Sequence, residues 1–379
     1  MKAAKHHYVP EWYQRRFIPP KSKDNNLWVL DLDPQPIPHP GGHHFDPNPR
    51  RRGPDGSFQV PGLYSLHLGQ KVSDIIETHF FGEIDRLGGP AVAALSEFVF
   101  TKTPSPNVQD LTGYLGAQKM RTPKGLAYLK AEAKTDDQEH AIYLMQKLHL
   151  AYVTMWMEGI WEVLRCDHTP TKLIITDNPV TCFNRQLPWD KPECRHPYEP
   201  GIDLIGTQTL FSLGPTRLLV ISNLQFVRNH WINGKSQRTN ARMFGDTMFY
   251  LGGIHTGRQM NEGEVRAANY ILKKMATKFI AAGEEEWLYP EQKVKTKVWR
   301  DLGGEFFLRP DPRRTGFAGA MYVGYKDGSS WGMDEYGRVP DESDPNRKAQ
   351  HDVEWESAQR TKEYWEKRHG PLPPGSMLI

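Results

Sequence analysis

The sequence has no apolar run of eighteen or more residues, so it predicts no transmembrane helix. Its first five residues include the charged Lys2 and Lys5 and lead into no apolar stretch, so it predicts no secretory signal. Three cysteines, Cys166, Cys182 and Cys194, are too few and too irregularly spaced for a disulfide framework or a zinc site. A protein of the reducing cytoplasm, without a membrane partner, is therefore expected.

Several common catalytic motifs are also missing. There is no Walker loop, no Gly-x-Gly-x-x-Gly after a strand and no Gly-x-Ser-x-Gly elbow. His-Glu-x-x-His and paired Cys-x-x-Cys motifs do not occur either. These absences disfavour the common nucleotide-binding, hydrolase and zinc classes, and we expect neither a cofactor nor a bound metal.

Charge of one sign does not dominate the chain, whose formal net charge is +3. The whole molecule is therefore not a general binder of nucleic acid, but arginine is concentrated locally. Arg50, Arg51 and Arg52 form one run, and Arg313 and Arg314 form another. Because arginine makes bidentate phosphate contacts, we predict that these runs bind DNA, with a duplex, modified or plain, as the partner. The alternative is a solvated loop without a partner, and the oligomeric state is left open.

The 379 residues are 38% hydrophobic and 11% aromatic, which supports a packed core. Their pattern predicts an α+β fold, mainly helical, with a small central sheet and a C-terminal extension that contains a β-hairpin. Helices are expected over Lys71 to Asp85, Ala91 to Phe100, Asn107 to Met120, Glu139 to Arg165 and Val265 to Ala282. Strands are expected over Leu27 to Leu32, over Lys172 to Thr176 and within Phe211 to Asn223.

The regions rich in proline, glycine and charge predict loops and a boundary. Residues 34–62 and 184–207 are expected to be long loops. In the tail, Asp327-Gly328 predicts a hairpin turn, and Val353 to Arg368 predicts a helix. We therefore expect a core domain over residues 1–290 and a C-terminal extension over residues 291–379.

Six short segments, in order, carry a resemblance to a known family. They are His6-His7-Tyr8-Val9-Pro10, Leu63-Tyr64-Ser65, Gln118-Lys119-Met120-Arg121-Thr122-Pro123, Thr176-Asp177-Asn178-Pro179-Val180, Leu213-Gly214-Pro215, and the pair Asn269 and Ala276. Over residues 5–282 the chain resembles the bacterial family named domain of unknown function 4238, although the fourth segment lacks that family's serine. The family's name implies no activity, but its scattered, accessory character implies a role in defence.

The strongest catalytic candidates are Asp177 and Asn178, a polar pair at the end of a predicted buried strand. The carboxylate could activate a water, and the amide could orient it. The alternative is a turn in which either side chain bonds the backbone ahead of Pro179. His6 and His7 are further candidates, and on an extended segment they point to opposite sides, so one of them is expected to enter a site. That histidine could hold a phosphate, act as an acid or bind a metal, or it could simply bond the backbone.

Substrate contacts are predicted for Gln118, Arg121, Tyr8 and Tyr64, which lie in the shared segments. Gln118 and Arg121 are three apart on a predicted helix and share a face, so Arg121 could bind a phosphate or a carboxylate. The alternative is a structural ion pair of Arg121 with Glu77 or Glu83. These two acids and Asp85 are spread around their helix, which disfavours one compact metal site.

Three functions fit these features. The first is a metal-independent hydrolase acting on DNA, most concretely an N-glycosylase that removes modified bases in antiviral defence. Asp177, Asn178, His7 and the aromatic-rich N-terminal segment would serve to place the water, stabilise the sugar cation and grip the base. The second is a nuclease in which histidine and carboxylates hold Mg²⁺. The third is a non-catalytic module that recognises nucleic acid or another acidic partner through its arginine runs.

Overall fold

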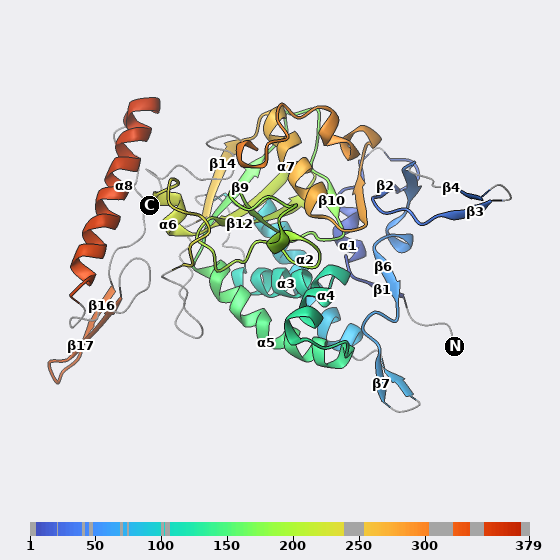
Figure 1. Ribbon diagram of the computed structural model, residues 1–379, viewed down its shortest axis with the longest axis horizontal. Helices are drawn as coiled ribbons and strands as arrows, with labels where there is room; N and C mark the ends of the chain where they lie inside the picture. Colours follow the sequence, from blue (N-terminus) through green and yellow to red (C-terminus); the bar gives the residue numbers. More distant parts are fainter. Residues whose placement is uncertain are drawn as a thin grey trace.

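The computed structural model describes residues 5–20, 22–39, 42–44, 48–68, 71–73, 76–99, 102, 107–238, 254–302, 321–333 and 345–372 (Figure 1). The fold is of the mixed α+β class and mainly helical, with several small sheets, which confirms the predicted class. In these ranges, no helix combines the length and the apolar character needed to cross a membrane.

The largest sheet has five strands in the order β11-β12-β13-β9-β14. Their bounds are β9 Ile160–Arg165, β11 Thr181–Asn184, β12 Thr207–Gly214, β13 Arg217–Ser222 and β14 Ile254–Gln259. All neighbours are antiparallel except β14 and β9. Every residue of β12 and β13 is buried, and Leu218–Ile221 of β13 form a continuous apolar run, as a strand buried on both faces requires. The buried strand expected within Phe211 to Asn223, with the sequence Arg-Leu-Leu-Val-Ile-Ser, is β13, and the chain turns at Pro215 to pair it with β12.

A second sheet has four antiparallel strands in the order β10-β15-β2-β5. The strands are β2 Leu27–Asp31, β5 Arg50–Arg52, β10 Ile175–Thr176 and β15 Phe279–Ala282. Two predictions are corrected here. The strand expected over Lys172 to Thr176 is only two residues long, and the loop expected over residues 34–62 contains strands. Besides β5, these are β3 Ile37–His39 paired with β4 Gly42–His44, and β6 Gln59–Pro61 paired with β1 Lys5–His7.

Helices α2 to α5 pack together beside the five-stranded sheet (Figure 1). They are α2 Gly82–Ser96, α3 Val108–Met120, α4 Pro123–Ala133 and α5 Gln138–Met157. The two helices predicted between Lys71 and Phe100 are one, since a π-helical turn over Ile76–Phe81 leads directly into α2. Residues Lys71–Ser73 form strand β8, paired with β7 Leu66–Leu68. α3 matches its prediction and is capped by Asn107, whose side chain accepts from the Asp110 amide at 3.1 Å.

Two helices end earlier in the structure than predicted. The one expected over Glu139 to Arg165 ends at Met157, and the one expected over Val265 to Ala282 is α7 Glu262–Met275. In both cases the last residues are strands, β9 and β15, because they pair with distant segments. The remaining short helices are α1 Glu11–Arg15, α6 Leu224–Arg228 and single 3₁₀ turns at Pro54–Gly56, Pro192–Cys194, Glu285–Leu288, Pro290–Gln292 and Trp299–Asp301.

The tail contains the predicted hairpin, with β16 Met321–Gly324 paired to β17 Ser330–Met333. Gly328 adopts φ +86° in its turn, a conformation that glycine accommodates without strain. The predicted helix is also present as the longer α8 Arg347–His369. Hairpin and helix lie to one side of the body in Figure 1, and Tyr364 of α8 packs edge to face on Trp231 at 5.1 Å. The body itself includes Trp299, whose indole donates to the Asn184 carbonyl at 2.9 Å.

Candidate functional site

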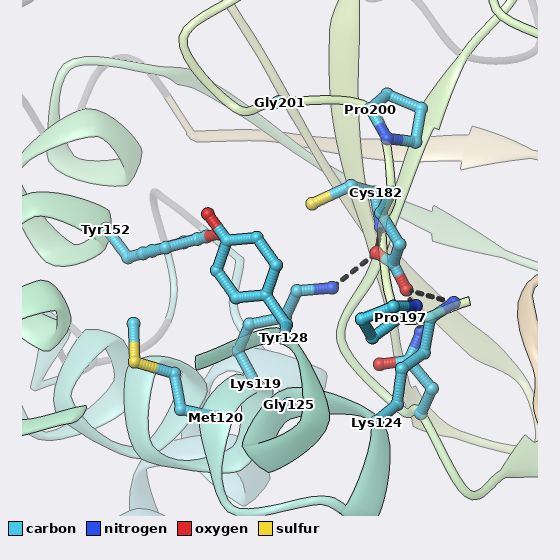
Figure 2. Close-up of a pocket in the computed structure, with 12 residues that line it drawn as sticks. Lys119, Met120, Lys124, Gly125, Tyr128, Tyr152, Cys182, Pro197, Pro200 and Gly201 are labelled. Carbon is cyan, nitrogen blue, oxygen red and sulfur yellow. Dashed lines mark hydrogen bonds and ion pairs between the residues drawn. The ribbon is translucent and has the colours of Figure 1, made fainter. Parts of the chain in front are cut away.

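A cavity of about 50 Å³ lies where α3 and α4 approach β11 and the segment 197–201. Its size suits a few water-sized groups. Figure 2 shows Lys119, Lys124 and Tyr128 on the helical side, opposite Cys182, Pro197 and Pro200. The complete lining is Lys119, Met120, Lys124, Gly125, Tyr128, Tyr152, Asn178, Cys182, Pro197, Glu199, Pro200 and Gly201.

A tight turn between α3 and α4 brings the two lysines to this cavity. The Thr122 hydroxyl accepts from the Gly125 amide at 3.0 Å and caps α4, whose first residue is Pro123. Gly125 is required here, because a Cβ atom would lie 2.5 Å from the carbonyl oxygens of Lys119 and Met120. The helices can therefore approach closely enough for Lys119 and Lys124 to face one acceptor.

That acceptor is Glu199, whose side chain is only 7% exposed. Lys124 Nζ lies 2.8 Å from Oε1, and Lys119 Nζ is bonded to Oε2. The Asn178 amide also donates to Oε1, and the Cys182 backbone N–H donates to Oε2 at 3.0 Å. Burial alone would raise the pKa of Glu199, but the two ammonium groups and their hydrogen bonds lower it to about 2. The cavity thus contains a fixed carboxylate anion at neutral pH.

Each of the two lysines also donates to a backbone carbonyl. Lys119 Nζ donates to the Val180 carbonyl at 3.0 Å, and Lys124 Nζ donates to the Met275 carbonyl at 2.8 Å. Burial lowers the pKa of Lys119, but the neighbouring Cys182 and Glu199 groups outweigh this and raise it overall. Lys119 therefore stays protonated, and the cluster binds helix α3 to strand β11 and to the end of α7.

Asp177 lies outside this cavity lining and has a different set of partners. Its carboxylate accepts from three consecutive backbone amides, those of Thr277 at 3.0 Å, Lys278, and Phe279 at 3.1 Å. Burial raises the pKa of Asp177, and the three N–H groups oppose that rise. The carboxylate thus caps the backbone between α7 and β15. This is neither the water-facing base nor the local turn before Pro179 that the sequence suggested.

Asn178 is the predicted catalytic residue that does line the cavity. It is 1% exposed, and its position is fixed from both sides. Its backbone N–H donates to the Thr176 hydroxyl at 3.1 Å, and its carbonyl accepts from the Thr181 hydroxyl at 2.8 Å. The amide group is therefore held against Glu199.

The two histidines separate as the strand geometry predicts. His6 is 1% exposed, and its Nδ1 accepts from the Tyr64 backbone N–H at 2.9 Å. Its ring also stacks on Tyr64 with centroids 5.5 Å apart. His7 is more exposed, and its Nε2 lies 3.7 Å from a carboxylate oxygen of Glu11. For His6, the geometry is that of the backbone-bonding alternative, and neither ring lines the cavity.

Gln118, Arg121, Tyr8 and Tyr64 form one buried network together with Asp85. Arg121 forms a two-pronged ion pair with Asp85 at 3.0 and 2.9 Å, and its Nε donates to Gln118 at 2.8 Å. Gln118 in turn donates to the Tyr8 carbonyl at 2.8 Å, and the Tyr64 hydroxyl donates to the Arg121 carbonyl. The structural ion pair of Arg121 is present, but its partner is Asp85, since Glu83 is paired with Arg86 on the helix surface.

This network and Asp177 meet at Tyr8. Burial raises the pKa of the Tyr8 phenol, and the negative charges of Asp177 and Asp31 raise it further. The predicted site residues thus belong mainly to the interior framework that joins β1, α3 and β15, and they do not together line the cavity. Of that set, Asn178 contributes to the cavity lining.

The arginine run is a strand and not a loop. Arg51 lies over the Trp28 ring at 5.4 Å and pairs with Asp24, whereas Arg50 and Arg52 are exposed and line a second pocket. The other predicted DNA contacts, Arg313 and Arg314, lie outside the described residues.

Sequence reasoning missed Glu199, Lys119 and Lys124. Lys119 lies inside a recognised motif, and its charge among the apolar residues of α3 was the available signal. Glu199 lies in an irregular segment between Pro197 and Pro200, where no periodicity marks it. Within the described residues, no three or more His, Cys, Asp or Glu side chains gather where they could hold a metal ion.

Comparisons of the chain with models of protein families, with curated proteins and with solved structures find no match. The family resemblance of its six short segments therefore remains a prediction.

Proposed function

We propose that this protein is a metal-independent hydrolase acting on DNA, an N-glycosylase that removes modified bases, and that the cavity around Glu199 and Asn178 is its site. The observation that carries the proposal is a carboxylate kept ionised inside a cavity, between two ammonium groups and an amide. Fixed charges of this kind stabilise developing charge in a transition state without reorganisation.

Each group has a defined part in the proposed reaction. As the bond from C1′ to the base breaks, positive charge develops on the sugar, and the Glu199 anion stabilises it. Its pKa of about 2 makes Glu199 a weak base, so its role is electrostatic. Asn178 orients the water whose oxygen bonds to C1′. Lys119, whose pKa is raised, keeps its proton and stabilises the negative charge that develops on the leaving base. The attacking water releases one proton and the departing base takes one up, so the protons balance.

The cavity admits the reacting atoms and not a whole base. The base would be gripped at its rim, where Tyr128 and Tyr198 pack edge to face with ring centroids 6.0 Å apart. Aromatic rings at this position can stack on an extruded base.

The test is incubation of purified protein with plain and modified duplex DNA, with and without EDTA. Abasic sites that form in EDTA are the expected product. Strand breaks that require Mg²⁺ would indicate the nuclease instead, and binding without any product would indicate a recognition module. Either result would overturn the proposal.

A cavity-blocking variant locates the activity without disturbing the charged cluster. Tyr128→Trp should fill the rim and abolish base release while the far-ultraviolet circular dichroism stays unchanged. The matched control is Tyr143→Trp, since Tyr143 is 54% exposed on α5 and outside the cavity lining. Equal activity of both variants would place the reaction elsewhere.

The compartment and the biological role belong to the same proposal. The thiols of Cys166, Cys182 and Cys194 are all free and buried, which supports a reducing compartment, the cytoplasm. The resemblance to a bacterial accessory family supports antiviral defence as the role. The recognition module is the second candidate, and the exposed pair Arg50 and Arg52 favours it.

A further inference from the structure

The second pocket lies on one face of the four-stranded sheet, with a volume of about 170 Å³. Strand β2 contributes Val29 and Asp31, β5 contributes Arg50 and Arg52, and β15 contributes Phe279. The remaining lining residues are Pro34, Gln35 and Asn48. This pocket is separate from the Glu199 cavity, since the two share no lining residue.

Strand geometry divides the three arginines between the two faces of the sheet. Alternate side chains of a strand point to opposite sides, so Arg50 and Arg52 share a face and Arg51 has the other. The register agrees, since Arg50 lies opposite Val29, which also lines the pocket, and Arg51 lies opposite Trp28. Arg51 stacks on that Trp28 ring and donates from its Nε to Asp24 at 3.1 Å.

The pocket face has a surplus of positive charge. Its lining holds two guanidinium groups and one carboxylate, that of Asp31. Both arginines are exposed, and the Arg52 guanidinium makes no ion pair or hydrogen bond within the part of the chain that the structure describes. The side-chain amides of Gln35 and Asn48 add uncharged donors, and Phe279 and Pro34 add apolar surface.

We propose that this pocket binds one backbone phosphodiester of DNA, through Arg50 and Arg52 and without Arg51. Guanidinium groups present paired donors that match the non-bridging phosphate oxygens. Among the lining residues, two guanidinium groups stand against the one carboxylate of Asp31, a composition that suits a singly charged phosphodiester. Phe279 and Pro34 would contact the adjoining sugar. The choice of DNA as the polymer rests on the proposed function, whereas the phosphate chemistry rests on the pocket itself.

The test is fluorescence anisotropy of a labelled DNA duplex over a range of NaCl concentrations, with EDTA present. Each lost phosphate contact lowers the slope of log affinity against log salt by about 0.9. Arg50→Ala/Arg52→Ala removes that one phosphate contact and should therefore flatten the slope by about 0.9, and Arg51→Ala should leave it unchanged. Equal slopes for the wild type and the double variant would overturn the proposal. So would an Arg51→Ala effect as large as that of Arg50→Ala or Arg52→Ala alone.

Two further measurements distinguish the charge of the two arginines from their geometry, and DNA from free phosphate as the ligand. Arg50→Lys/Arg52→Lys keeps the charge, so the slope should stay near that of the wild type while the affinity falls. Inorganic phosphate is then added to the protein alone and its melting temperature is measured. If phosphate stabilises the wild type but not the double alanine variant, and the protein does not bind DNA, the assignment of DNA as the ligand is overturned.

This outcome is distinguishable from failure of the hydrolase. DNA binding that depends on Arg50 and Arg52 without abasic sites would refute the glycosylase and leave the pocket standing. Abasic sites formed equally by the wild type and the double variant at low DNA concentration would refute the phosphate-binding pocket and leave the glycosylase standing.

Discussion

The molecule holds its positive charge in two opposite ways. Around Glu199, two lysines are buried, and each ammonium group has a carboxylate and a backbone carbonyl as partners. On strand β5, two arginines are exposed and line an open pocket. The first arrangement fixes positions at the cost of desolvating three charges, and the second keeps its charges hydrated. Buried charges of this kind can act only on what enters their cavity, whereas exposed ones can select a partner in solution.

The largest expected effect comes from removing the anion of the buried cluster. Glu199→Gln leaves two buried ammonium groups without their counter-charge, which should lower the free energy of unfolding by about 3–5 kcal/mol. Urea denaturation followed by circular dichroism measures this. Glu83→Gln, which breaks the fully exposed pair with Arg86, should leave the midpoint unchanged. Similar losses for the two variants would mean that the cluster is hydrated and not buried.

The pH dependence of the unfolding free energy tests the same buried cluster. The pKa of Glu199 is lowered from an ordinary 4.5 to about 2, so its contribution is fully present above pH 4.5 and is lost as pH falls toward 2. That contribution should be about 3 kcal/mol, from 1.36 kcal/mol per pKa unit. The measurement is the unfolding free energy of the wild type minus that of Lys119→Met/Glu199→Gln between pH 5 and pH 2. A difference that stays constant over this range would contradict the lowered pKa.

Asp177→Asn tests whether this residue holds the backbone or acts on a substrate. The amide NH₂ would face one of the three backbone N–H donors, so stability should fall by about 1–3 kcal/mol. Asp190→Asn, at an exposed position, is the matched control and should have no effect. If Asp177→Asn keeps full stability but loses base release, the catalytic interpretation of Asp177 is restored.

The smallest expected effects lie on strand β5. Arg51→Ala removes the stack on Trp28 and the pair with Asp24, so the melting temperature should fall by about 1–2 °C. Arg52→Ala should leave it unchanged, since that side chain is exposed over the pocket. Differential scanning fluorimetry of both variants is the measurement. A larger fall for Arg52→Ala would show that its guanidinium supports the fold.

Short sequence motifs predicted helix caps and tight turns well. Asn107 caps α3, and Asp327-Gly328 forms the hairpin turn, because these features depend on a few neighbouring residues. The predictions failed where pairing with distant segments decides the structure. Ile160–Arg165 and Phe279–Ala282 continue helix-like apolar patterns, but each lies between two strands from elsewhere in the chain and extends accordingly.

The same distinction applies to the site. Polar residues of the shared motifs do contact one another, as Gln118 to Tyr8 and His6 to Tyr64 show, but of the predicted catalytic residues Asn178 lines the Glu199 cavity. Their partners could not be foreseen, because the donors to Asp177 lie 100–102 residues further along the chain. Glu199 could not be predicted for a related reason, since its burial is created by helices and loops that meet only in the folded protein.

The strand order β10-β15-β2-β5 also constrains when the protein can fold during its synthesis. Strand β2 ends at Asp31, but its neighbour β15 ends only at Ala282. At roughly 5–20 residues per second, the ribosome needs on the order of 10–50 s to make the intervening chain. During that time one edge of β2 is unpaired and the Asp177 carboxylate lacks its three donors. The free edge of β2 can therefore pair wrongly while the intervening residues are made, and the second sheet closes only after β15 has been synthesised.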